Sequence, residues 1–193
     1  MTTTLRRTAG SLAAAFTLVL SFALVQGFGG GTAVAAPAPT AVRVVYYDAS
    51  QAQEFKAAVD EGAAAWNKAV RNVQLKPATG GNAAVRVYAD NGWPRTYQSG
   101  FGRGTVYMGR EAVNDGFYPP RIATHELGHI LGLPDNRNGR CDYLMSGHSS
   151  PVSCKSTTPH STEAAQVERN AGGGIAALAR DSRESAFADC FVF

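Results

Sequence analysis

The 193-residue chain carries little charge, and neither sign predominates. Charged residues make up 17% of it, with 18 Lys and Arg against 15 Asp and Glu. Without residues 1–35 two arginines are lost and no carboxylate, so 16 basic minus 15 acidic residues leave a formal charge of +1. Such a balanced chain lacks the basic surface that nucleic acids require, so we expect no nucleic-acid partner.

Cysteine is also scarce, and internal repeats are missing from the sequence. The three cysteines are Cys141, Cys154 and Cys190. One disulfide can therefore form in an oxidising compartment, with one thiol left over. Low-complexity sequence is limited to an Ala/Pro stretch at residues 33–39. The length fits one domain with its own core and is too short to suggest two.

A long apolar run occurs only at the N-terminus. An arginine pair precedes the run from Leu12 to Phe28, and Ala33-Val34-Ala35 follows it. This order predicts a secretory signal peptide over residues 1–35 and a secreted, extracellular protein. A membrane anchor is the alternative, but Ser21 and Gln26 interrupt the run. The arginine pair leaves the general and the twin-arginine export routes both open.

Short apolar segments separated by turn residues predict four strands. They are Val42–Tyr47, Val73–Leu75, Ala84–Ala89 and Thr105–Met108. After the first strand, Ser50 with Gln53 three residues on suggests a capping box. Apolar residues from Phe55 to Val70 then recur at the spacing of a long amphipathic helix.

Two further helices are predicted in the second half of the chain. Pro119-Pro120 suits the first turn of a helix that ends at Gly132, and Thr162–Asn170 has helical spacing. We therefore expect an α+β fold, with a small twisted mixed sheet, a long backing helix, a second helix and a C-terminal helix.

The second helix carries a pattern that is typical of metal chemistry. Residues four apart lie one above the other on a helix, so His125 and His129 can point their imidazoles at one zinc ion. Glu126 sits about 100° around the helix from His125. It can therefore reach a water on the metal without being a ligand, which is the place of a general base.

Zinc of this kind needs a third protein ligand, which a straight helix cannot supply. Gly132 can adopt a left-handed conformation that ends the helix and turns the chain back. Asp135, three residues later, could then return to the metal, and Leu133-Pro134 favours an extended path to it. His148 is the alternative third ligand.

The pattern HExxHxxGxxD, together with the sequence Leu144-Met145-Ser146-Gly147 shortly after it, resembles the snapalysin family. These are small secreted bacterial zinc endopeptidases allied to the metzincins. The resemblance implies a metzincin-like fold, one Zn²⁺ per chain, and ligands His125, His129 and Asp135. It also implies that Met145 lies in a turn, called the Met-turn, beneath the metal-binding histidines.

The resemblance continues outside the motif. It includes Tyr46-Tyr47-Asp48-Ala49-Ser50, the Gly102-Arg103-Gly104 segment, and a disulfide around the Met-turn. In this chain that disulfide would join Cys141 to Cys154, which leaves Cys190 without an assigned partner. The family further implies a preference for Tyr or Phe after the cleaved bond. No residue of a specificity pocket can be named from the sequence.

Two departures from the family pattern affect the site. Relatives can bind calcium through oxygen side chains just before the active-site helix, whereas this chain has Phe117-Tyr118-Pro119-Pro120 there. That argues against a calcium site. Relatives have a tyrosine two positions after the third ligand, whereas this chain has Arg137 there. Arg137 and Tyr143 are both candidates to support the oxyanion.

The expected function is zinc-dependent hydrolysis of extracellular proteins by a monomer, with Glu126 as general base. A peptide would extend along the Thr105–Met108 strand, taken as a sheet edge. The alternatives are a zinc amidase acting on cell-wall peptides and a noncatalytic, zinc-stabilised binding module. The expected organisation is a signal peptide (1–35), a short linker or propeptide remnant (36–41), a catalytic domain (42–170) and a tail (171–193).

Overall fold

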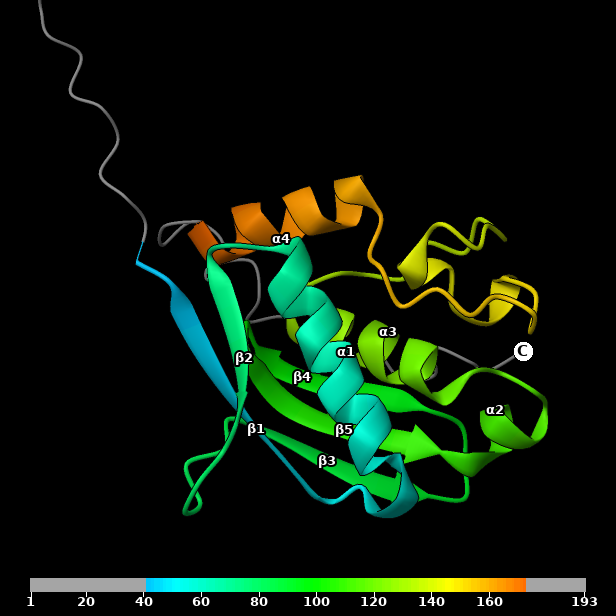
Figure 1. Cartoon of the computed structure of the whole chain (residues 1–193), viewed down its shortest axis with the longest axis horizontal. Coiled ribbons are helices and arrows are strands. Elements are labelled where there is room, and N and C mark those ends of the chain that lie inside the picture. The colour runs from blue at the N-terminus through cyan, green and yellow to red at the C-terminus, as the bar shows by residue number, and fades with distance from the viewer. Residues whose placement is uncertain (1–40, 173–193) are drawn as a thin grey trace, which may run out of the picture. The chain divides into compact units, whose positions relative to one another are not determined.

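The structure is a computed structural model that describes residues 41–172 (Figure 1). The predicted signal peptide and Cys190 lie outside the described residues. Between residues 41 and 172, none of the helices combines the length and the apolar character needed to cross a membrane.

Five strands form one mixed sheet in the order β2-β1-β3-β5-β4. Strands β1, β2, β3 and β5 run parallel to one another, and the edge strand β4 pairs antiparallel with β5. The strands are β1 (Arg43–Gln51), β2 (Val73–Pro77), β3 (Val85–Asp90), β4 (Arg95–Gly100) and β5 (Arg103–Gly109). The predicted α+β class is confirmed.

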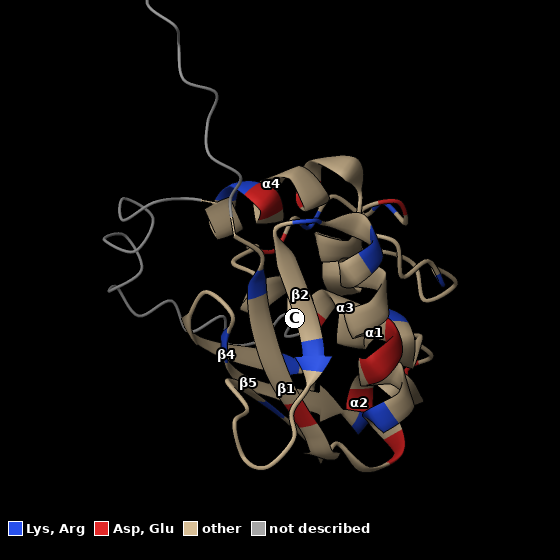
Figure 2. Cartoon of the chain, turned by 60° about the vertical axis from the view of Figure 1, so that its left-hand side comes forward, with Lys and Arg blue, Asp and Glu red and all other residues tan. Residues whose placement is uncertain are grey.

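Helices cover one face of this sheet. Figure 2 shows α1 and α3 together on the same side of it, with α4 beyond the end of the sheet. The helices are α1 (Lys56–Ala69), α2 (Arg110–Asn114), α3 (Pro119–Ile130) and α4 (Ser161–Gly172), with 3₁₀ turns at Gln53–Phe55 and Leu144–Ser149.

Buried and exposed side chains alternate along β1 and show which face of the sheet the helices cover. Val45 and Tyr47 are buried, whereas Val44 and Tyr46 are 40% and 42% exposed. Successive side chains of a strand point to opposite faces. The face that carries Val45 therefore packs under the helices, and the other face meets solvent.

Helices α1 and α3 approach each other closely. A Cβ on Gly62 of α1 would lie only 2.9 Å from the backbone nitrogen of Thr124 in α3. Beside this contact, the fully buried Trp66 donates its indole N–H to the Thr124 carbonyl at 2.8 Å. Apolar burial of an aromatic side chain stabilises a fold by about 1.5–3 kcal/mol, so this contact helps to fix α3 on its support.

The predicted capping box at Ser50 is wrong. Ser50 still belongs to β1, because the pairing of β1 with β3 extends as far as Gln51 opposite Tyr88. A 3₁₀ turn then leads into α1, whose N-cap position is Phe55 without a side-chain cap. Sheet pairing has therefore overridden a local capping signal.

The sequence also failed to reveal β4 and α2. Because β4 pairs with β5, the Thr105–Met108 segment lies inside the sheet between β3 and β4 and cannot be its edge. The edge strand on this side is β4, which contains few β-branched residues and has only Thr96 fully buried. Such a half-exposed strand gives a weak sequence signal.

Candidate metal centre

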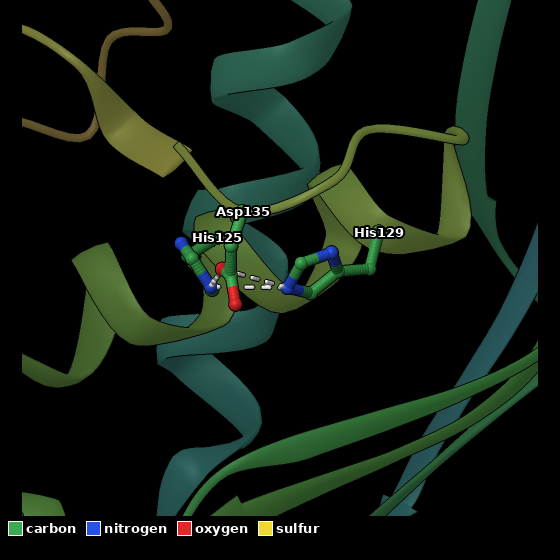
Figure 3. A group of neighbouring side chains, drawn as sticks. All are labelled: His125, His129 and Asp135. Atoms are coloured by element: carbon green, nitrogen blue, oxygen red, sulfur yellow. Dashed lines mark hydrogen bonds and ion pairs between the residues drawn. The ribbon is translucent and has the colours of Figure 1, made fainter. Parts of the chain in front are cut away.

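Helix α3 carries two histidines on one buried face. His125 and His129 are one turn apart, and their Nε2 atoms lie 3.1 Å from each other. Both rings are almost completely buried. The two imidazoles and the carboxylate of Asp135 converge on one point (Figure 3).

Asp135 reaches this point because the chain reverses after α3. Gly132 has a φ of 78°, and the Leu133 N–H donates to the Gly128 carbonyl at 3.1 Å. Asp135 Oδ1 then lies 3.2 Å from His125 Nε2 and 3.5 Å from His129 Nε2. The left-handed conformation is one that favours glycine, and it explains the need for Gly132.

Backbone carbonyls orient both imidazole rings. Since a carbonyl can only accept, His125 Nδ1 donates to Leu144 at 3.0 Å and His129 Nδ1 donates to Leu133 at 2.7 Å. In the neutral rings the lone pairs therefore lie on the two Nε2 atoms, which face Asp135.

This donor set fits a bound metal. Two Nε2 atoms and one carboxylate oxygen are mutually 3.1–3.5 Å apart. Tetrahedral zinc ligands, each about 2.1 Å from the ion, lie roughly 3.3 Å from one another. Asp135 Oδ1 is buried and faces the two Nε2 atoms. Acceptors gathered in this way repel one another unless a cation or a proton lies between them.

The pKa values in the metal-free protein reflect this crowding. Burial acts to lower the pKa of His125, but the bond to Asp135 and the nearby carboxylates outweigh it and raise the pKa. Burial and the neighbouring His125 lower the pKa of His129 to about 3. Burial alone would raise the pKa of Asp135, yet the two imidazoles and Arg137 lower it. A proton and a metal ion would therefore compete for His125 Nε2.

Glu126 lies beside the two histidines and is fully buried. Its Oε2 accepts a hydrogen bond from Thr96 Oγ1 of β4 at 2.7 Å, whereas its Oε1 accepts none. Burial raises the pKa of Glu126 to about 7, although the charge of His125 and the Thr96 bond act in the opposite direction. A buried carboxylate with one held and one available oxygen can exchange a proton near neutrality.

The Met-turn packs directly against α3. A Cβ on Gly128 would lie 2.7 Å from Met145 Sδ and 3.1 Å from Trp66 Cζ2, so only glycine fits between the two histidines at this point. Cys141 and Cys154 form a disulfide that spans the Met-turn.

The other candidate residues lie around this cluster. Arg137 donates to Asp135 Oδ2 at 3.2 Å, and its Nη1 lies 3.3 Å from His148 Nε2. The Tyr143 ring stacks on His160, with centroids 4.0 Å apart. Among the described residues, the group of possible ligands contains Asp135 and does not contain His148.

Sequence reasoning missed three buried polar residues that contact the site: Thr96, Arg121 and Glu163. No spacing rule connects Thr96 of β4 with α3, because the contact arises only when the sheet forms. Arg121 could have been found from the sequence, since it precedes His125 by one helical turn on α3.

A small hollow that is open to solvent adjoins His125. Apolar side chains predominate in its wall, which is formed by Phe117, Tyr118, Arg121, Ile122, His125, Leu144 and Gly147. Sequence analysis could not name these residues as neighbours, because they come from two separate segments, 117–125 and 144–147.

Comparison with known proteins identifies relatives of the whole described region. Residues 41–173 match the model of the Streptomyces extracellular neutral proteinase (M7) family. Proteins named extracellular small neutral protease are 38% identical in Streptomyces coelicolor over 150 residues and 38% identical in Streptomyces caespitosus over 125 residues. These alignments cover 76% and 64% of this chain, and 67% and 92% of the two relatives. The match to the Streptomyces lividans protein covers only 59% of that relative.

Proposed function

Because the chain belongs to the Streptomyces extracellular neutral proteinase (M7) family, whose members are metallopeptidases, we propose that it is a secreted zinc endopeptidase acting on extracellular proteins. One observation carries this proposal. His125, His129 and Asp135 offer three ligand atoms within 4.8 Å of one another, next to a buried Glu126 with an available oxygen.

The three residues would hold the metal through His125 Nε2, His129 Nε2 and an oxygen of Asp135. When bound, zinc supplies a Lewis acid that polarises the substrate carbonyl and makes water more acidic near neutral pH. Two imidazoles and one carboxylate are a usual ligand set for catalytic zinc. Met145 packs against α3 at Gly128, and the disulfide closes the loop that carries Met145.

Glu126 serves as the general base and then as the general acid. Its Oε1 takes a proton from the attacking water and returns it to the leaving amine. The Thr96 hydroxyl holds Oε2 at 2.7 Å, so the carboxylate cannot rotate freely and Oε1 faces the reaction.

The substrate would extend along β4. This strand is the edge of the described sheet, and its inward side chain Thr96 contacts Glu126. An extended peptide can add to such an edge through backbone hydrogen bonds, which brings its carbonyl groups past the catalytic carboxylate.

The apolar hollow beside His125 would contact the side chain that follows the cleaved bond. Phe117, Tyr118 and Ile122 form its apolar wall. This supports the preference for Tyr or Phe at that position. Of the two oxyanion candidates we favour Arg137, because it lies against Asp135 whereas the Tyr143 ring stacks on His160. A monomer suffices, since one chain supplies all three ligands.

The test is metal analysis of the purified secreted protein together with casein hydrolysis before and after treatment with a zinc chelator. We expect one zinc per chain, casein cleavage, and loss of cleavage that added zinc restores. Purified cell wall is the second substrate. Activity on wall peptides with none on casein would replace the endopeptidase by an amidase, and bound zinc with neither activity would indicate a binding module.

A further inference from the structure

Two successive peptide groups of the Met-turn are held by a pair of buried, oppositely charged side chains. Arg121 Nη2 donates to the Tyr143 carbonyl at 2.7 Å. On the other side, the carboxylate of Glu163 accepts the N–H groups of Leu144 at 3.1 Å and Met145 at 2.7 Å. Arg121 and Glu163 are each only 6% exposed. The turn therefore lies between a buried cation and a buried anion.

Both charged side chains anchor more than the turn itself. Arg121 Nη1 also donates to the carbonyls of Cys141 and Ser156 at 3.0 and 2.8 Å, so it spans the disulfide-closed loop. Glu163 additionally accepts the His160 N–H at 2.7 Å. Arg121 belongs to α3 and Glu163 to α4. Their hydrogen bonds thus connect α3 and α4 through the loop between these two helices.

The same peptide groups determine the orientation of a histidine. The Leu144 carbonyl accepts the hydrogen bond from His125 Nδ1, and the N–H of that peptide group, which belongs to Met145, is bound to Glu163. A peptide group is planar, and its C=O and N–H point in opposite directions. A carboxylate that holds the N–H of Met145 therefore aims the Leu144 carbonyl at His125.

We propose that Glu163 and Arg121 are positioning residues for His125, which act on its ring through the Met-turn backbone and not by contact with the metal. The link to activity rests on the proposed zinc function, but the link to the ring of His125 does not. A partner that fixes the outer nitrogen of a metal-binding imidazole also fixes its tautomer and direction, and its loss typically weakens metal binding about 10- to 100-fold.

The chain provides a matched control on the same helix. Glu168 of α4 also accepts two backbone N–H groups with its carboxylate, those of Arg71 at 2.5 Å and Asn72 at 3.0 Å. These belong to the turn between α1 and β2, outside the Met-turn loop. Glu168→Gln removes the same kind of interaction as Glu163→Gln, without touching the Met-turn.

The experiment compares Glu163→Gln and Glu168→Gln with the parent in the mature protein. Zinc affinity is measured by competition with a chromophoric chelator, stability by thermal unfolding, and kcat and KM on a casein-derived peptide. We expect both variants to lose thermal stability. Only Glu163→Gln should weaken zinc binding by about tenfold or more and lower kcat with little change in KM.

A spectroscopic measurement tests the ring itself without metal or substrate. Long-range ¹H–¹⁵N NMR spectra of the metal-free protein show which nitrogen of neutral His125 carries the proton. The parent and Glu168→Gln should carry it on Nδ1, whereas Glu163→Gln should show a mixture. If the parent binds no zinc, the proposed function fails, and this spectrum still decides the present inference.

Arg121→Lys provides a second variant, because one ammonium group cannot reach all three carbonyls that the guanidinium binds. It should also weaken zinc binding, and it decides the matter if Glu163→Gln does not fold. If the Glu163→Gln and Arg121→Lys proteins lose stability but keep parental zinc affinity and the Nδ1–H tautomer, the two residues only support the fold and the inference is overturned.

Discussion

Replacement of Thr96 by valine tests how Glu126, the proposed general base, is held. Valine has nearly the shape of threonine, so the change removes the hydroxyl and leaves the packing of β4 intact. The lost bond joins Thr96 Oγ1 to Glu126 Oε2 at 2.7 Å, and both residues are fully buried. Glu126 then loses the one donor that holds Oε2, and the loss of this bond also raises its pKa.

The expected size of the effect follows from this contact. A hydrogen bond to a charged group contributes about 1.5–3 kcal/mol. Each 1.36 kcal/mol of transition-state stabilisation corresponds to a factor of ten. If the bond acts through the orientation of Glu126, Thr96→Val should lower kcat about 10- to 150-fold. KM should change little, because the hydroxyl points away from the substrate and toward the carboxylate.

The assay is steady-state cleavage of a casein-derived peptide by zinc-loaded enzyme, with zinc content measured on the same samples. Thr96→Ser should recover most of kcat because it restores the hydroxyl. Thr124→Val is the matched control, since it removes another buried hydroxyl, which donates to the Pro120 carbonyl at 2.7 Å and not to Glu126. A Thr96→Val enzyme with kcat within twofold of the parent would refute this account of Glu126.

Three other predictions concern the cluster and its loop. Glu126→Gln should keep its zinc and lower kcat by about 10²–10⁴-fold, and near-parental casein cleavage would contradict its role as base. Asp135→Ala should lose most zinc while His148→Ala retains it, as metal analysis of both will show; the reverse result would reassign the third ligand. Reduction of Cys141–Cys154 should remove up to about 3 kcal/mol of stability in thermal unfolding with little loss of zinc, unless mass mapping finds a different pairing.

Local sequence was enough to predict the elements whose signals are periodic. The spacing of His125 and His129 follows from the helical repeat, so the convergence of their imidazoles could be read from the chain. The turn at Gly132 was also readable, because only glycine adopts that conformation without strain. The sequence predicted most elements to within a few residues, apart from the start of α1 and the end of β1. These elements are strands β1, β2, β3 and β5 and helices α1, α3 and α4.

Sheet pairing, by contrast, could not be predicted from local sequence. Ser50 does not cap a helix, because β1 continues as far as the pairing of Gln51 with Tyr88. The segment Arg95–Gly100, which has a weak strand signal, forms an edge strand because it pairs with β5. Hydrogen bonds between strands depend on which segments meet, and that depends on the packing of the whole domain.

The sequence by itself determined which residues can bind a metal and which carboxylate stands beside them, because both follow from positions on one helix and one turn. Only the tertiary structure decided what holds those groups. Thr96 reaches Glu126 from the edge strand, and Glu163 reaches the Met-turn from α4. These contacts join segments 18 to 30 residues apart. Buried polar groups must find partners wherever the fold brings them, and no local pattern records which partner that will be.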